Sequence, residues 1–299
     1  PAARGLFARA IAQSSAPGLV TTADRAADWA EQFVDLLPLD DVSDPVAALE
    51  RATPGELGRA GNRLTAKVIS ETPGLIPFGP VVDGDFLPRP PLDAYTDGSA
   101  HPVPLIIGTN ADEATLFTKV LRGFPTTPDK FGKMFALTEP DAESRVTSAY
   151  PGYPDEATAV ELGGDYMFWA PSIAIAEAHS RYAPTYSYRF DFAPRLLDLL
   201  GLGATHAFDL FAVFAYGNRP VGRAVTLLGG RRGMRAVTDA MQQQWLSFAQ
   251  HGTPLRSWPA YDIEARATMI FDATSAVQND PRHEKRLSWS GYHGYDTHL

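Results

Sequence analysis

Residues 184–214 have the sequence PTYSYRFDFAPRLLDLLGLGATHAFDLFAVF, and the rest of the chain is best understood from this stretch. Over residues 186–191 aromatic side chains alternate with polar or charged ones, a pattern typical of a β-strand. A loop rich in glycine, residues 201–206, then leads to His206. Small residues ahead of His206 let the backbone turn sharply and let another group approach the ring closely. The stretch therefore predicts a strand followed by a tight loop that presents a histidine.

Two interpretations of His206 are open from this stretch alone. An imidazole on a loop beyond a strand end is well placed for proton transfer near pH 7. The alternative is a surface histidine in a flexible loop, which this stretch alone favours. Asp209 lies in the apolar run that follows, so a metal site built from His206 and Asp209 is a further hypothesis. No other possible ligands have suitable spacing, which makes the metal hypothesis weak.

A second strand signal ends in an acidic turn. Residues 103–108 form a short apolar run, as expected of a parallel strand buried on both faces. Thr109 or Asn110 is predicted to cap the helix that begins near residue 114. In open α/β sheets the working residues gather just beyond the carboxyl ends of the strands, so Glu113 is a candidate for chemistry. The alternative is that Asp112 and Glu113 only complement the positive end of the helix dipole, and we favour it for Asp112.

Composition excludes several classes of function. The chain has 299 residues, 44% of them hydrophobic, which is ample for a core. Its formal net charge is −9 and its basic residues form no long stripe, which argues against nucleic acid as a partner. It contains no cysteine, so disulfides and cysteine-ligated metals are excluded and a reducing, cytoplasmic compartment is slightly favoured. No apolar run approaches the length of a membrane span, so no membrane partner is expected.

Other segments are interpreted as scaffold. Residues 6–13 form a short, mostly apolar run that suggests a helix end feeding a buried strand, and such a strand needs neighbours on both sides. Thr21 or Thr22 is predicted to cap a helix running to about Leu37. Residues 165–182 predict one amphipathic helix that Pro171 kinks or restarts, with Phe168 and Trp169 in the core rather than in a pocket. Residues 234–250 have apolar side chains at helical spacing. The tail after residue 280 is expected to be peripheral, and its histidines lack the spacing of metal ligands.

The order of the two candidate residues is informative. Glu113 lies beyond one predicted strand, and His206 follows 93 residues later beyond another. In the α/β-hydrolase arrangement the chain order is serine, then acid, then histidine. The sequence supplies the last two members in that order. The first member should lie in a G-x-S-x-G turn, and that motif does not occur in these 299 residues.

Several further segments carry a resemblance to known proteins. They are GLFARAIAQS (5–14), FGPVVDG (78–84), IGTNADE (107–113), GATH (203–206), DL (209–210) with Phe214, WLSFAQHGTP (245–254), WPAY (258–261) and MIF (269–271). On these segments the chain resembles the C-terminal part of the type-B carboxylesterases, a family that includes cholinesterases and bacterial para-nitrobenzyl esterases. The segments span nearly the whole chain in family order and together are highly specific.

The resemblance implies both a fold and a site. It implies an α/β class fold, the C-terminal portion of an α/β-hydrolase with a mostly parallel sheet flanked by helices, with residues 1–299 forming one partial domain. It places the family's triad glutamate on Glu113 and its triad histidine on His206, with no cofactor and no metal. In the family the segment matching residues 5–14 follows closely after the nucleophile elbow. We therefore expect the serine to lie in a segment upstream of residue 1. Ala114 and Ala207 stand where the family often has glycine.

The implied activity is hydrolysis of a small-molecule carboxylic ester by Ser-His-Glu acyl transfer. His206 would act as general base and general acid, while Glu113 would orient its ring. Because the elbow and the Gly-rich oxyanion-hole segment are absent, this chain alone is expected to be inactive. The alternative is a non-catalytic cholinesterase-like binding or adhesion module. Such a module would have no need of both Glu113 and His206.

Overall fold

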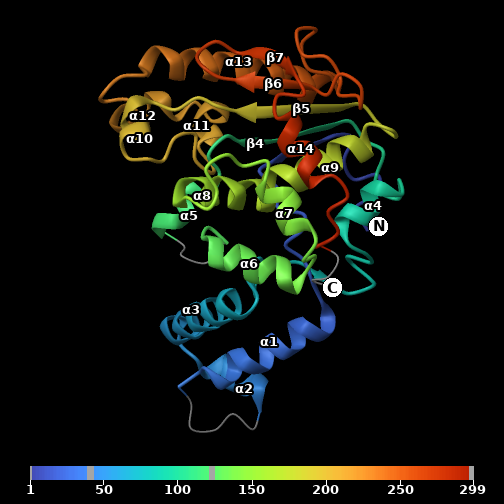
Figure 1. Ribbon diagram of the computed structural model, residues 1–299, viewed down its shortest axis with the longest axis vertical. Coiled ribbons are helices and arrows are strands. Elements are labelled where there is room, and N and C mark those ends of the chain that lie inside the picture. Colours follow the sequence, from blue (N-terminus) through green and yellow to red (C-terminus); the bar gives the residue numbers. More distant parts are fainter. Residues whose placement is uncertain (1, 39–43, 121–124, 296–299) are drawn as a thin grey trace.

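A five-stranded sheet lies at the centre of the computed structural model, which describes residues 2–38, 44–120 and 125–295. The strand order is β1-β4-β5-β6-β7, and the first four strands are parallel while β7 is antiparallel to β6 (Figure 1). This confirms the predicted α/β class with a mostly parallel sheet. The strands are β1 (Ala10–Gln13), β4 (Leu105–Asn110), β5 (Thr185–Phe190), β6 (Ala267–Phe271) and β7 (Ala276–Asn279), and a separate parallel pair is β2 (Thr21–Thr22) with β3 (Val81–Val82).

The strands predicted from residues 103–108 and 186–191 both form, as β4 and β5. β4 is buried at every position, because helices cover both faces of a parallel sheet. β4 also continues two residues further than expected, so Thr109 and Asn110 are strand residues and the prediction that either caps a helix is wrong. The register places Asn110 beside Phe190, so β4 and β5 end at the same edge of the sheet.

β1 has one neighbour in the described part of the chain rather than the two expected. It pairs with β4 from Ala10 to Gln13, and its residues are half-buried or exposed. Its other edge faces away from β4 and hydrogen-bonds to no strand among the described residues. β1 is therefore an open edge of the central sheet.

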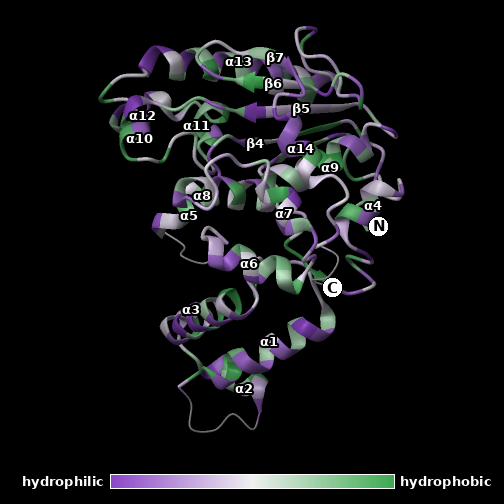
Figure 2. Cartoon of the chain, in the orientation of Figure 1, coloured by the Kyte–Doolittle hydropathy of each residue, from purple (hydrophilic) through white to green (hydrophobic). Residues whose placement is uncertain are grey.

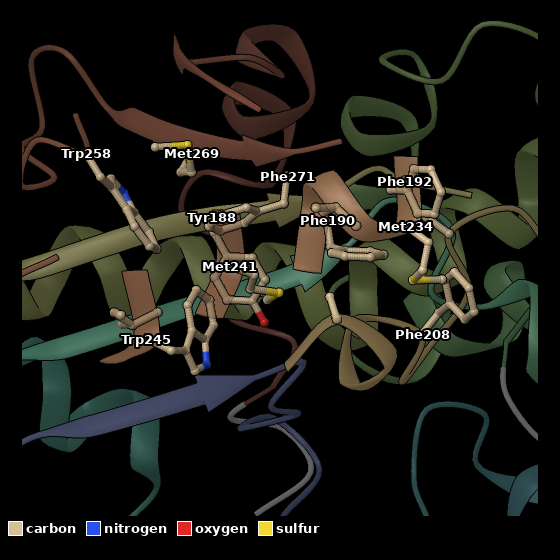
Figure 3. Packing of buried hydrophobic residues seen from close by; sticks show 14 of the residues in the cluster. Tyr188, Phe190, Phe192, Phe208, Met234, Met241, Trp245, Trp258, Met269 and Phe271 are labelled. Atoms are coloured by element: carbon tan, nitrogen blue, oxygen red, sulfur yellow. The ribbon is translucent and has the colours of Figure 1, made fainter. Parts of the chain in front are cut away.

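Helices cover both faces of the sheet. One cluster contains α13 (Arg231–His251), whose buried Met241 and Trp245 pack on β5 and β6 (Figure 3). Phe248 of the same helix contacts Tyr186 of β5. Hydrophilic and hydrophobic residues are mixed along α13, as its helical spacing predicts (Figure 2). On the opposite face, Leu105 and Ile107 of β4 pack against Ile175 and Ala176 of α9 (Ala170–His179).

The remaining helices extend the fold beyond the sheet. α1, α2 and α3 lie at the far end of the molecule from β6 and β7 (Figure 1). Thr22 caps α1, as predicted, by accepting a hydrogen bond from the N–H of Arg25. The bounds are α1 (Ala23–Asp35), α2 (Pro45–Arg51), α3 (Pro54–Glu71), α4 (Pro91–Thr96), α5 (Thr115–Val120), α6 (Pro128–Leu137), α7 (Ala142–Thr147), α8 (Glu156–Gly164), α10 (Arg195–Leu199), α11 (Asp209–Val213), α12 (Pro220–Val225) and α14 (His283–Trp289), with a π-helix η1 (Asp165–Trp169) and a 3₁₀-helix η2 (Tyr216–Asn218).

The C-terminal segment is not peripheral. Trp289, Tyr292 and Tyr295 are buried in a cluster with residues of α6, α7 and α8. Arg282 of this segment forms ion pairs with Glu161 and Asp165, so its polar residues also bind it to the rest of the fold. Within the described ranges, none of the helices combines the length and the apolar character that crossing a bilayer requires.

Candidate active site

Glu113 lies in the turn between β4 and α5, and its side chain is almost fully buried (2% exposed). One carboxylate oxygen, Oε1, accepts hydrogen bonds from the backbone N–H of Asn110 at 2.7 Å and from the hydroxyl of Ser14 at 2.5 Å. The other, Oε2, lies 2.5 Å from Nδ1 of His206. Three hydrogen bonds therefore hold the carboxylate in one orientation.

The loop before His206 is hydrogen-bonded to the Glu113 turn. The N–H of Asp112 donates to the carbonyl of Ala204 at 3.1 Å, and the N–H of Ala204 donates to Oδ2 of Asp112 at 2.9 Å. The side-chain amide of Asn110 donates to the carbonyl of Thr205 at 2.6 Å. These bonds hold the residue preceding His206 directly over the turn that carries Glu113.

A glycine makes this close approach possible. Gly203 has φ +57°, and a Cβ added there would lie 2.2 Å from Oδ2 of Asp112. The close approach expected from the small residues is present both at the loop backbone and at the imidazole ring, where Oε2 of Glu113 lies 2.5 Å from Nδ1. Asp112 therefore ties the histidine loop in place, and burial raises the pKa of its carboxyl group despite the opposing hydrogen bond from Ala204.

The imidazole of His206 packs against two aromatic rings and remains partly exposed to solvent. Its centroid is 5.1 Å from that of Phe117 and 4.8 Å from that of Phe168. Its side chain is 27% exposed, and Nε2 makes no hydrogen bond to any residue in the described ranges. When the carboxylate of Glu113 accepts a hydrogen bond from Nδ1–H, the proton stays on the ring and the lone pair of Nε2 is free to accept a proton from another group.

Asp209 belongs to a different network. Its Oδ2 accepts a hydrogen bond from Nε2 of Gln13 at 2.6 Å and one from the hydroxyl of Tyr188 at 3.1 Å. Burial, and then the charge of Asp209, hold the pKa of Tyr188 well above its usual value. The carboxylate of Asp209 therefore does not join His206, and the described residues contain no group of three or more His, Cys, Asp and Glu side chains arranged to hold a metal ion.

Sequence reasoning missed three residues of this site. Ser14 lies just beyond the end of β1, at the same sheet edge as Glu113, and its φ of +49° is unusual for a residue with a side chain. Its position beyond a strand end was the signal that could have identified it. Phe117 and Phe168 carried no such signal, because aromatic residues at helical spacing usually belong to a core.

The expected departure at Ala207 has a structural counterpart. Ala207 has φ +65°, in the left-handed region that glycine adopts without steric penalty. A left-handed conformation costs a residue with a Cβ roughly 1–2 kcal/mol. The alanine is therefore accommodated at some cost in stability, directly after His206.

Comparison with known proteins gives consistent results. The sequence profile of the carboxylesterase family matches residues 1–289. The chain is 31% identical to the para-nitrobenzyl esterase of Bacillus subtilis (strain 168) over 96% of its own length and 57% of that protein. It is 30% identical to the bile salt-activated lipase of Bos taurus over 88% of its own length and 48% of that protein.

Solved structures show the same relationship. A structure of PNB esterase superposes with a TM-score of 0.77 at 28% identity, covering 97% of this chain and 58% of that one. The Geobacillus stearothermophilus carboxylesterase EST55 superposes with a TM-score of 0.75 at 29% identity, covering 97% of this chain and 60% of that one. The chain thus spans about half the length of these relatives, and it has the α/β-hydrolase fold expected of an ester hydrolase. With its sequence profile and its structure in agreement, this chain belongs to the carboxylesterase family.

Proposed function

We propose that this chain supplies the acid and the base of a Ser-His-Glu catalytic triad that hydrolyses small-molecule carboxylic esters. The observation that carries the proposal is the 2.5 Å contact between Oε2 of Glu113 and Nδ1 of His206, with Nε2 left open. This is the arrangement that a serine needs from its general base: an oriented imidazole with one free lone pair. Both residues come from turns beyond adjacent parallel strands, where α/β enzymes place reacting groups.

We further propose that the nucleophilic serine lies in a segment upstream of residue 1 and that residues 1–299 are one part of a single hydrolase domain. The free edge of β1 supports this, because a parallel strand paired there would end beside Ser14 and the Glu113–His206 pair. The lengths of the relatives leave room for such a segment.

The reaction then proceeds by two acyl transfers. The serine hydroxyl attacks the ester carbonyl carbon while Nε2 of His206 takes its proton, and the tetrahedral intermediate collapses as His206 returns that proton to the leaving alcohol. A water molecule repeats the sequence on the acyl-enzyme and releases the carboxylic acid. Glu113 holds the Nδ1 proton and stabilises the imidazolium, while the donors of the oxyanion hole come from the upstream segment. Loss of one triad member lowers the rate of such a reaction about 10⁴-fold or more. Since residues 1–299 do not contain the proposed serine motif, we expect them to be essentially inactive on their own.

The test uses the full-length gene product and its His206→Ala variant, with a p-nitrophenyl ester as substrate. We expect the variant to lose roughly 10⁴-fold or more in kcat, because the general base is gone. His251→Ala, which removes an exposed histidine at the end of α13, is the matched control and should keep the wild-type rate. Equal rates for wild type and His206→Ala would remove His206 from the mechanism.

A second measurement locates the nucleophile. A fluorophosphonate labels the activated serine of such enzymes, and peptide mapping should place the label upstream of residue 1. An intact mass of the gene product equal to the 32.4 kDa of these 299 residues would contradict the upstream serine. An unlabelled protein that folds but hydrolyses no ester would favour the binding or adhesion module instead.

A further inference from the structure

The imidazole of His206 packs against the short π-helix η1, whose π-helical hydrogen bonding the local sequence did not predict. Phe168, in η1, contacts the imidazole with an angle of 30° between the rings, and Phe117 stacks on Phe168 at 6.0 Å. Phe168 is only 5% exposed, so it presents little surface to a substrate and mainly supports the histidine. Any movement of Phe168 changes the space in which the imidazole can rotate.

Pro171 explains why the helix changes its hydrogen bonding at this point. It has no N–H to donate to the preceding turn, and the N–H of Ala170 donates to the carbonyl of Asp165, five residues back. The predicted single helix over residues 165–182 is therefore a π-turn followed by α9. π-helical segments such as η1 are rare in proteins, and those that occur often lie at functional sites.

The start of this π-turn lies against the Glu113 turn. A Cβ added at Gly164, the residue before η1, would lie 3.2 Å from Cβ of Glu113. The segment thus contacts both members of the catalytic pair: Glu113 at Gly164 and His206 at Phe168. Its position bears directly on their alignment.

One side chain from the C-terminal segment holds both ends of the π-turn. Nη1 of Arg282 pairs with Oδ1 of Asp165, the first residue of η1, at 2.6 Å. The guanidinium carbon of Arg282 lies 4.7 Å from the ring centroid of Trp169, its last residue. Asp165 is held further by the hydroxyl of Tyr150, which donates to Oδ2 at 2.7 Å. α14, which follows Arg282 directly, lies against α9 (Figure 1).

We propose that Arg282 is a positioning residue for His206, acting through the π-turn and Phe168. The proposal rests on the proposed function, because it concerns the alignment of the histidine in that reaction. Loss of the guanidinium removes the ion pair at Asp165 and the ring contact at Trp169, so η1 is held less firmly even though Tyr150 still binds Asp165. Phe168 then confines the imidazole less tightly, and the fraction of molecules with Nε2 directed at the serine falls. A misplacement of about 1 Å in a reacting group can cost on the order of 100-fold in rate.

The test compares Phe168→Leu, Arg282→Met and the double variant in the full-length protein. We expect each single variant to lower kcat for a p-nitrophenyl ester by about tenfold or more, while KM changes by less than about threefold, because neither side chain binds the substrate. Since Arg282 acts through Phe168, the double variant should lose no more than the worse single variant. The downfield proton resonance of the Glu113–His206 hydrogen bond should broaden or shift in both single variants.

The matched control is Lys285→Met. Lys285 lies in the first turn of α14, pairs with Glu161 and lies 4.4 Å from the ring centroid of Tyr150. Among the described residues it makes neither an ion pair or hydrogen bond with Asp165 nor a ring contact with Trp169, the two ends of η1. It should keep the wild-type kcat and the wild-type resonance even where its melting temperature falls. If Arg282→Met does not fold, Arg282→Lys replaces it, because lysine keeps the charge for Asp165 without the planar stack on Trp169.

The proposal is overturned by losses that multiply in the double variant, by an unchanged kcat in either folded single variant, or by an equal loss in Lys285→Met. These outcomes are separate from failure of the proposed function, which would appear as full activity in His206→Ala.

Discussion

Replacing Glu113 by glutamine tests the proposed catalytic pair, Glu113 and His206, with the smallest possible change in shape. The carboxylate oxygen that accepts from the backbone N–H of Asn110 and from Ser14 can be replaced by the amide oxygen with both bonds intact. The amide nitrogen then faces Nδ1 of His206 at the 2.5 Å contact. Because an amide N–H only donates, Nδ1 must become the acceptor and the ring proton must move to Nε2.

The expected loss in kcat of Glu113→Gln depends on whether the change in the histidine tautomer outweighs the loss of folding stability. With the proton on Nε2, the imidazole cannot accept the serine proton, and such a tautomer change in a triad costs about 10⁴-fold in kcat, or roughly 5 kcal/mol of transition-state stabilisation. The opposite amide orientation would leave the N–H of Asn110 buried against a donor, which costs about 1–3 kcal/mol. The retained hydrogen bonds keep the loss of folding stability well below the catalytic loss. Glu113→Gln should therefore fold and be nearly inactive.

The assay is kcat for a p-nitrophenyl ester with the full-length protein, alongside thermal unfolding of each variant. Glu156→Gln, the same chemical change at an exposed position early in α8, is the control and should retain the wild-type kcat. A folded Glu113→Gln variant that keeps more than about a tenth of wild-type kcat would refute the reasoning, since the tautomer argument predicts a far larger loss.

Three further predictions concern the loop that carries His206. Gly203→Ala should lower the free energy of unfolding by about 1–3 kcal/mol in urea denaturation and should also lower kcat, because its Cβ would clash with Asp112; an unchanged midpoint would contradict this. Ala207→Gly should raise the melting temperature by about 2 °C, because relief of roughly 1–2 kcal/mol of left-handed strain exceeds the roughly 0.5–1 kcal/mol entropic cost of glycine; a lower melting temperature would show the strain to be absent. Asp112→Asn keeps a side-chain oxygen that can accept the hydrogen bond from the backbone N–H of Ala204. The folded pKa of Asp112 is raised, so the wild-type carboxylate costs stability once pH exceeds its unfolded value of about 3.9. The variant should therefore be more stable than wild type at pH 7, with the gain disappearing below about pH 4, and a gain that is equal at both pH values would contradict burial as its cause.

Local patterns were sufficient for the elements that are regular and strongly periodic. β4 and β5 form where short apolar or alternating runs predicted them, and α13 forms where apolar residues recur at helical spacing. The cap at Thr22 was also predicted, because an N-cap depends on residues within one turn. The predicted cap at Thr109 or Asn110 was wrong because of a contact distant in sequence. Both side chains could cap a helix, but both residues pair with β5 and are therefore part of the sheet.

Sequence by itself determined the chemical types and the order of the acid and the histidine, and it placed each beyond a strand. Only the tertiary structure decided what holds them: the hydroxyl of Ser14 on Glu113, the carboxylate of Asp112 on the loop of His206, and the ring of Phe168 on the imidazole. Each of these contacts joins segments that lie far apart in the chain. No periodicity or spacing encodes such a contact, because it exists only once parallel strands have brought their carboxyl ends to one edge of the sheet.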